Sequence, residues 1–183
     1  MPCADCRRLK TLGVCHDAPL CLDWLWGGGG DADGSGLASA MMATYTLQGE
    51  ADTAALAQAL AEKRHTLPPV MTLEGPLGVG KTRFMRFYLK ALGWHGPVIS
   101  PTYGLIQVYD LPQGPLWHVD CYRLGSPEEI YALGLVDAMM LHPCCIEWPQ
   151  RIAPFLPPVR QALTFDFDTD QTRRLRHECF GLG

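Results

Sequence analysis

Residues 75–82 read Gly-Pro-Leu-Gly-Val-Gly-Lys-Thr, and they constrain the fold more than any other stretch of the chain. They match G-x-x-x-x-G-K-[ST], the pattern of the phosphate-binding P-loop. Val70–Leu73 before the loop is short and apolar, which predicts a buried parallel strand. After the loop, apolar residues recur at helical spacing, and Gly93 stands where a helix commonly ends. The predicted order is strand, loop and helix; a chance glycine turn is the less favoured alternative.

The loop predicts nucleotide binding through its backbone. Its glycines let several N–H groups point at one cluster of phosphate oxygens, and the following helix adds the positive end of its dipole. Lys81 can reach the β- and γ-phosphates, and the Thr82 hydroxyl can bind Mg²⁺. The predicted phosphate-binding residues are Gly75, Pro76, Leu77, Gly78, Val79, Gly80, Lys81 and Thr82.

Composition excludes several classes of protein. The net charge of −4 and the pI near 5.8 argue against a dedicated nucleic-acid surface. The sequence contains no asparagine, so the N-K-x-D motif that reads guanine in GTPases is absent. No apolar run is long enough to predict a membrane helix, and the first residues do not resemble a secretory signal. We therefore expect a cytoplasmic protein whose eight cysteines are reduced.

Two regions of different composition are expected. Residues 1–41 form a Cys- and Gly-rich extension that we expect to be disordered, and residues 42–183 form the P-loop domain. A zinc site on Cys3, Cys6, Cys15 and Cys21 is an alternative, but the second pair is spaced wrongly for a zinc ribbon. Translation from Met41 or Met42 is a third interpretation that the sequence leaves open.

The domain is expected to begin with a strand at Thr44–Leu47 and a helix capped by Asp52 or Thr53. Turn residues between alternating apolar runs predict two hairpins, and a third apolar run is expected to pack in the core. The hairpins comprise Gly104–Leu111 with Leu116–Tyr122 and Leu163–Phe167 with Arg173–Phe180; the core run is Leu135–Leu141.

Three further sites carry residues suited to phosphate chemistry. Ser100-Pro101-Thr102 places hydroxyls on a rigid turn, as a switch that senses the γ-phosphate would need. Asp120 lies near a strand end as a candidate ligand or water-orienting group, although a salt bridge to Arg123 would also explain it. Glu147 ends a short apolar run, the position at which P-loop proteins carry the carboxylate that meets Mg²⁺.

Together these motifs resemble the TsaE family of bacterial tRNA threonylcarbamoyladenosine biosynthesis ATPases. The resemblance spans about residues 44–180 and rests on the P-loop, Ser100-Pro101-Thr102 and two more specific stretches. These are His118-Val119-Asp120-Cys121-Tyr122-Arg123-Leu124 and Ile146-Glu147-Trp148-Pro149.

The resemblance implies a single P-loop α/β domain, with a mixed central sheet flanked by helices, that binds ATP and Mg²⁺. By position, Thr82 and Glu147 would hold Mg²⁺, and Asp120 would lie near the γ-phosphate. The implied catalytic residues are Lys81, Asp120 and Glu147; Thr53 and Arg173 would contact the nucleotide, and Ser100, Pro101 and Thr102 would form the switch.

The resemblance also implies a function. The family supports formation of N6-threonylcarbamoyladenosine in tRNAs that read ANN codons, acting with the proteins TsaB and TsaD and meeting tRNA through that complex. The chain is then expected to be an Mg-dependent ATPase that is slow alone and stimulated by its partners. A small-molecule P-loop kinase is one alternative, and a nucleotide-gated binding module without essential hydrolysis is another.

Overall fold

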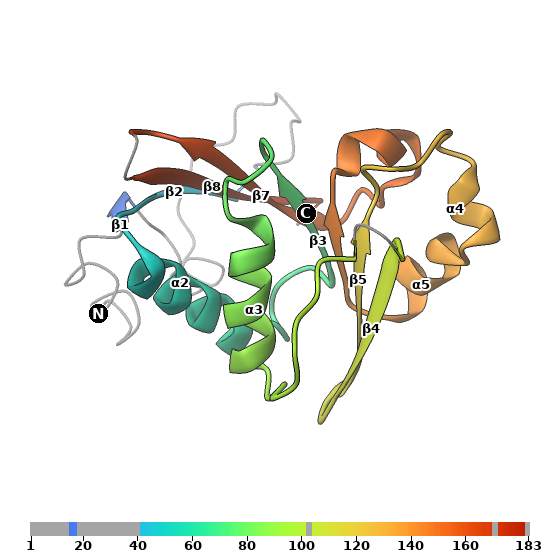
Figure 1. Ribbon diagram of the computed structural model, residues 1–183, viewed down its shortest axis with the longest axis horizontal. Coiled ribbons are helices and arrows are strands. Elements are labelled where there is room, and N and C mark those ends of the chain that lie inside the picture. Colours follow the sequence, from blue (N-terminus) through green and yellow to red (C-terminus); the bar gives the residue numbers. More distant parts are fainter. Residues whose placement is uncertain (1–14, 18–40, 102–103, 170–171, 182–183) are drawn as a thin grey trace, which may run out of the picture.

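A mixed eight-stranded sheet runs through the residues that the computed structural model describes, namely 15–17, 41–101, 104–169 and 172–181 (Figure 1). Its strands are β1 (Cys15–Asp17), β2 (Met41–Leu47), β3 (Val70–Glu74), β4 (Ile106–Leu111), β5 (Gly114–Asp120), β6 (Cys144–Glu147), β7 (Arg160–Phe167) and β8 (Arg173–Phe180). They lie in the order β1-β2-β8-β7-β3-β6-β5-β4. Strands β7, β3, β6 and β5 are parallel to one another, and antiparallel strands extend the sheet on both sides.

Helices cover both faces of the sheet, which explains why its central strands are largely apolar. Helices α2 (Glu50–Glu62) and α3 (Lys81–Ala91) lie together on one face (Figure 1). The other face packs against α4 (Glu129–Ala132), α5 (Leu135–Leu141) and the 3₁₀ segment η2 (Pro149–Phe155). Alternation along β3 serves both layers, because Met71 and Leu73 face α2 and α3 while Val70 faces the opposite cluster. The predicted fold class is confirmed.

The register of the parallel strands brings their carboxyl ends together. Strand β3 pairs with β6 from Val70 opposite Cys144 to Leu73 opposite Glu147. Strand β5 pairs with the other edge of β6 and places Asp120 directly opposite Glu147. The P-loop follows β3, so the loop and both acids lie at one edge of the sheet.

The start of α2 differs from the prediction. The helix begins at Glu50, with Gly49 as its N-cap residue, so neither Asp52 nor Thr53 caps it. Asp52 instead accepts a hydrogen bond from the backbone N–H of Gln48 at 2.7 Å, and the Thr53 hydroxyl donates to the Gly49 carbonyl at 3.1 Å. The helix starts earlier because Gly49 is already extended and the acids of the first turn favour the helix N-terminus.

The run Leu135–Leu141 packs in the core as predicted, but with only one of its sides. It forms α5, in which Leu135, Ala138 and Met139 are buried at helical spacing. Met140 and Leu141 lie on the other side of this helix and are 80% and 73% exposed.

Strand boundaries in the first hairpin also shift. Strand β4 begins at Ile106 rather than Gly104, because Leu105 has a positive φ of 62° that strand geometry does not allow. Strand β5 ends at Asp120 rather than Tyr122. The closing hairpin is present as β7 and β8.

Within the predicted N-terminal extension, the structure describes Cys15–Asp17, which pair antiparallel with β2. Its remaining residues before Met41 lie outside the described part of the chain, so disorder there stays a prediction. The same holds for a metal site on Cys3, Cys6 and Cys21.

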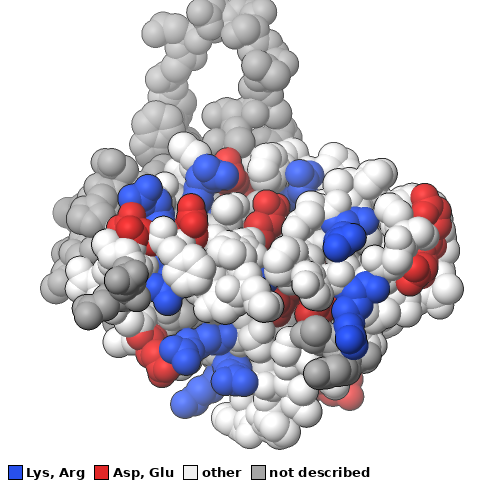
Figure 2. Space-filling model, turned by 45° about the horizontal axis from the view of Figure 1, so that its top comes forward, with Lys and Arg blue, Asp and Glu red and all other residues white. Residues whose placement is uncertain are grey.

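The surface carries both signs of charge. On the face drawn in Figure 2, Lys and Arg side chains lie among Asp and Glu side chains. Among the residues described, no helix has the length and apolar character needed to cross a membrane.

A buried polar pair joins the two strands of the closing hairpin. His177 on β8 is 3% exposed, and its Nε2 atom lies 3.1 Å from Oε1 of Gln161 on β7. Gln161 uses its amide nitrogen to donate to the Pro68 carbonyl at 2.8 Å. Burial lowers the pKa of His177 from its ordinary value of 6.5 to about 4.

This pKa predicts an acid-sensitive fold. Between pH 6.5 and about 4 the unfolded chain binds a proton at His177 that the folded chain does not bind. Stability should therefore fall with falling pH, by up to ~3 kcal/mol from this residue. The variant His177→Gln keeps a donor toward Gln161 but does not titrate, so its stability should vary less over this range. Urea unfolding at several pH values measures both proteins, and equal pH dependence would contradict the prediction.

Candidate functional site

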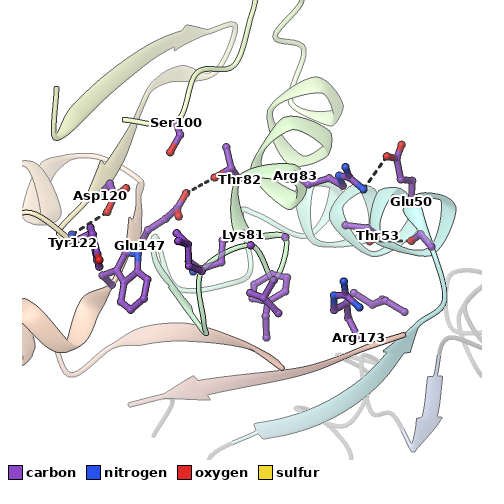
Figure 3. A pocket seen from close by; sticks show the side chains of 18 of the residues that line it. Glu50, Thr53, Lys81, Thr82, Arg83, Ser100, Asp120, Tyr122, Glu147 and Arg173 are labelled. Atoms are coloured by element: carbon purple, nitrogen blue, oxygen red, sulfur yellow. Dashed lines mark hydrogen bonds and ion pairs between the residues drawn. The ribbon is translucent and has the colours of Figure 1, made fainter. Parts of the chain in front are cut away.

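A cleft of about 780 Å³ opens at the carboxyl ends of the central strands and reaches across to the start of α2 (Figure 3). The loop after β3, both acids and the N-termini of α2 and α3 contribute to its walls. Its lining residues are Leu47, Gly49, Glu50, Thr53, Leu77, Gly78, Val79, Gly80, Lys81, Thr82, Arg83, Ser100, Asp120, Tyr122, Arg123, Glu147, Trp148, Phe165 and Arg173.

The predicted P-loop has the backbone that its glycines require. Gly75, Gly78 and Gly80 have φ angles of 132°, 77° and 117°, which side chains with a Cβ atom rarely adopt. Helix α3 begins directly after Gly80, so its N-terminus opens into the cleft. Such an N-terminus presents unpaired N–H groups and favours anions. The predicted strand, loop and helix are therefore confirmed.

Lys81 lies folded against its own loop. Its Nζ atom donates to the carbonyl oxygens of Gly75 and Pro76, at 2.7 and 3.0 Å. These two residues do not line the cleft themselves, whereas 77–82 do. Nζ also lies 4.6 Å from the centre of the Trp148 ring, within reach of a cation–π interaction. These contacts hold the ammonium group at the base of the loop.

Opposite charges surround this ammonium group. Lys81 is only 5% exposed, and burial lowers its pKa. The nearby carboxylates of Glu147 and Asp120 act in the other direction and raise that pKa. Both acids are 3% exposed, so the site concentrates two negative groups and one positive group in a largely dry space.

Thr82 and Glu147 offer oxygen atoms to a common point. The Thr82 hydroxyl donates to Oε1 of Glu147 at 3.4 Å, and Figure 3 shows both side chains facing the same space beside Ser100. Mg²⁺ binds hydroxyl and carboxylate oxygens and usually takes only one or two protein ligands. This donor pair therefore fits Mg²⁺, with the remaining positions left to phosphate oxygens and water.

Asp120 is held by the chain that follows it. Its Oδ1 atom accepts the backbone N–H of Tyr122 at 2.9 Å, and its own N–H donates to the carbonyl of Leu105 at 2.9 Å. The aromatic rings of Tyr122 and Trp148 pack with their centres 4.9 Å apart. The two acids thus end neighbouring strands, and the chain segments that follow them are joined by this aromatic contact.

Only part of the predicted switch can be placed. Ser100 lines the cleft, and Pro101 is buried without lining it. Thr102 lies outside the described residues. The residue before the switch, Ile99, accepts a hydrogen bond from the Tyr109 hydroxyl at 3.4 Å, which fixes the backbone next to Ser100.

Thr53 and Arg173 lie at the other end of the cleft from Asp120 (Figure 3). The Arg173 guanidinium stacks over the Phe167 ring, with its central carbon 4.4 Å from the ring centre. The structure thus brings both residues into one cleft with the P-loop, while their contact with a nucleotide stays a prediction.

Several residues in the cleft or next to it were not among the predicted site residues. Glu50 on α2 forms an ion pair with Arg83 on α3 at 3.0 Å, and this contact joins two successive helices that are separated by β3 and the P-loop. Trp148 has a left-handed backbone with φ of 58°, which turns its ring toward Lys81. His118 does not line the cleft but contacts Glu147; its position two residues before Asp120 indicates that these two side chains share a face of β5, but not that β6 lies alongside.

Comparison with known proteins gives consistent matches. The family model described as "Threonylcarbamoyl adenosine biosynthesis protein TsaE" matches residues 47–176. The chain is similar to proteins named "tRNA threonylcarbamoyladenosine biosynthesis protein TsaE". The one from Rickettsia bellii is 44% identical over 114 residues, which cover 61% of this chain and 77% of the relative. The one from Haemophilus influenzae is 36% identical over 110 residues, with 59% and 70% covered.

A solved structure is also similar. The crystal structure of YdiB from Bacillus subtilis superposes with a TM-score of 0.61 at 26% sequence identity. The alignment covers 78% of this chain and 88% of that protein.

The loop geometry predicts that Gly75 tolerates no side chain. A Cβ atom there would lie 2.3 Å from the carbonyl oxygen of Phe165, in addition to the cost of a φ of 132°. Gly75→Ala should lower the free energy of unfolding by about 3 kcal/mol or more. Gly78→Ala is the matched control, since a Cβ there meets no atom within 4 Å and only backbone strain of about 1–2 kcal/mol remains. Urea denaturation measures the free energy of unfolding of both variants. Equal losses of this free energy would show that the loop moves away from β7 and avoids the contact with Phe165.

Proposed function

Because this chain belongs to the TsaE family, we propose that it is the ATP-binding and ATP-hydrolysing component of the machinery that makes N6-threonylcarbamoyladenosine in tRNA. The tRNAs are those that read ANN codons. The observation that carries the proposal is the cleft in which the P-loop lysine lies near two buried carboxylates on adjacent parallel strands. A phosphate-binding loop beside two acids is the arrangement that metal-assisted phosphoanhydride hydrolysis uses.

We assign one ATP molecule to the whole length of the cleft, with its phosphates at one end and its nucleoside at the other. The loop N–H groups, the N-terminus of α3 and Lys81 bind the phosphates. Thr53 and Arg173 contact the nucleoside end. The length of the cleft, from Asp120 to the start of α2, supports this direction for the nucleotide.

Thr82 and Glu147 are assigned to hold Mg²⁺. When bound, this ion supplies positive charge next to the β- and γ-phosphates, where negative charge builds up during hydrolysis. The hydrogen bond between the two side chains supports the assignment, since it brings both oxygen donors together beforehand.

The remaining residues orient the attacking water and sense the γ-phosphate. Asp120 or Glu147 accepts a hydrogen bond from the attacking water, and Lys81 stabilises the charge of the departing phosphate. Ser100, with Pro101 and Thr102, responds to the γ-phosphate. Arg123 lies on the cleft wall beside these groups, whereas Arg151 does not line it.

The partners in this proposal are the proteins TsaB and TsaD. The chain meets tRNA through them, in the cytoplasm, and its own net charge of −4 supports leaving the RNA contacts to the partners. The chain docks onto TsaB and TsaD, and its ATP hydrolysis supports their turnover.

Cells test the pathway. Depleting the protein should lower the threonylcarbamoyladenosine content of tRNA, measured by mass spectrometry of tRNA nucleosides. Wild type should restore it and Lys81→Ala should not, because the loop then lacks its cation. Lys90→Ala is the control, since this exposed lysine lies on the same helix but away from the cleft. Unchanged modification after depletion would refute the proposed pathway.

Purified protein tests the enzymology. Alone, it should hydrolyse ATP slowly, and addition of TsaB and TsaD should raise turnover by at least about tenfold. Arginine residues supplied to a P-loop site by a partner can be worth ~10³-fold or more. Phosphate release with and without partners measures this effect. Equal rates would refute stimulation, and a phosphorylated small molecule would identify a kinase instead.

A further inference from the structure

His118 lies behind the site, in a position that the proposed function does not use. It is fully buried on β5, opposite Cys145 in the register and two residues before Asp120. Its Nε2 atom lies 3.0 Å from Oε1 of Glu147. Since Cys145 and Glu147 are two residues apart on β6, His118 and Glu147 are diagonal neighbours on one face of the sheet.

We infer that His118 is a positioning residue that orients the Glu147 carboxylate toward the metal and water side of the cleft. The inference rests on the proposed function, since it concerns how Glu147 would meet Mg²⁺. An ionised carboxylate can only accept hydrogen bonds, so the ring nitrogen that faces it, Nε2, carries the proton. The strand thus supplies a donor to Glu147 from the protein interior.

Two hydrogen bonds to the Glu147 carboxylate end on the same oxygen. Oε1 accepts from His118 Nε2 at 3.0 Å and from the Thr82 hydroxyl at 3.4 Å. Fixing one carboxylate oxygen from two sides sets the direction of the other, Oε2. A donor behind a metal-binding carboxylate is known to strengthen metal binding in this way, because it holds the ligand in its binding orientation.

The position of Glu147 opposite Asp120 gives such a donor a further role. Asp120 and Glu147 face each other across adjacent strands, where like charges repel. A hydrogen bond from His118 stabilises the Glu147 carboxylate and limits the rotation by which it could move away from Asp120 or toward Lys81. The donor therefore keeps the Glu147 carboxylate in place between Asp120 and Lys81.

The cost of keeping this imidazole indicates that it does more than fill space. Its second nitrogen, Nδ1, is buried and has no hydrogen-bond partner among the described residues. A buried polar atom without a partner destabilises a fold, and a leucine of similar size would avoid that cost. The ring itself is held in place by Tyr109, whose ring stacks on it with centres 6.4 Å apart.

The test separates the hydrogen bond from the shape of the side chain. His118→Leu removes the donor, and His118→Gln retains an amide donor near the same position. His177→Leu is the matched control, because it removes another histidine that is buried on a strand but away from the cleft. Each full-length variant is titrated with Mn²⁺ in the presence of ADP and followed by electron paramagnetic resonance. ADP affinity in EDTA and thermal unfolding are measured in parallel.

We expect His118→Leu to bind Mn²⁺ about 10- to 100-fold more weakly, the range found when the groups that support metal ligands are removed. Its ADP affinity in EDTA should stay within about twofold of wild type, because the P-loop is intact. His118→Gln should recover most of the metal affinity. His177→Leu should lose thermal stability but keep the wild-type affinity for Mn²⁺.

Unchanged Mn²⁺ affinity in folded His118→Leu would overturn the inference, and so would equal losses in the Leu and Gln variants. If His118→Leu does not fold, ¹⁵N spectra of the wild-type imidazole decide, since a proton on Nδ1 instead of Nε2 would refute the contact. Wild type that binds no metal–nucleotide would overturn both this inference and the proposed function. Wild type that binds it without hydrolysis, even with partners, would refute only the ATPase proposal, and the comparison of variants would still decide the inference.

Discussion

The parallel pairing of β3 with β6 determines how the P-loop lies relative to the Glu147 carboxylate. Leu73 stands opposite Glu147 in this pairing, so the loop that starts two residues after Leu73 must pass the Glu147 carboxylate. Side chains alternate between the faces of a sheet, so a slip of one residue would turn Glu147 toward the α5 side and away from Lys81. The apolar residues of β3 oppose such a slip, because Met71 and Leu73 are buried in one cluster and Val70 in the other.

The strand register that brings Lys81, Asp120 and Glu147 together also explains how the fold tolerates their buried charges. Isolated charges in a protein interior are costly, but here an ammonium group and two carboxylates lie close together. Loop carbonyls hold the lysine, a backbone N–H holds Asp120, and Thr82 and His118 hold Glu147. Each charge therefore has a partner that belongs to the scaffold, and the apolar clusters on both faces keep that scaffold in register.

Features that depend only on consecutive residues could be predicted from the sequence. The P-loop, its strand and its helix depend on local spacing and on glycines, and the acids at strand ends follow from short apolar runs. Features that depend on register or on distant contacts could not be predicted. The ion pair between Glu50 and Arg83 needs α2 and α3 side by side, and the contact of His118 needs β5 next to β6. The exposure of Met140 was missed because an apolar run was taken as core, although helical spacing buries only one of its sides.

The charge balance of the cleft also links its two proposed ligands. Asp120 and Glu147 both act on the pKa of Lys81, so this ammonium group compensates part of their negative charge. In the proposed function, phosphate groups compete for the same ammonium group and leave the two carboxylates with less compensation. Two like charges that face each other across adjacent strands then favour a divalent cation, since a hard cation seeks oxygen ligands and restores neutrality. Nucleotide and cation should therefore strengthen each other's binding, because each offsets the charge that the other leaves uncompensated.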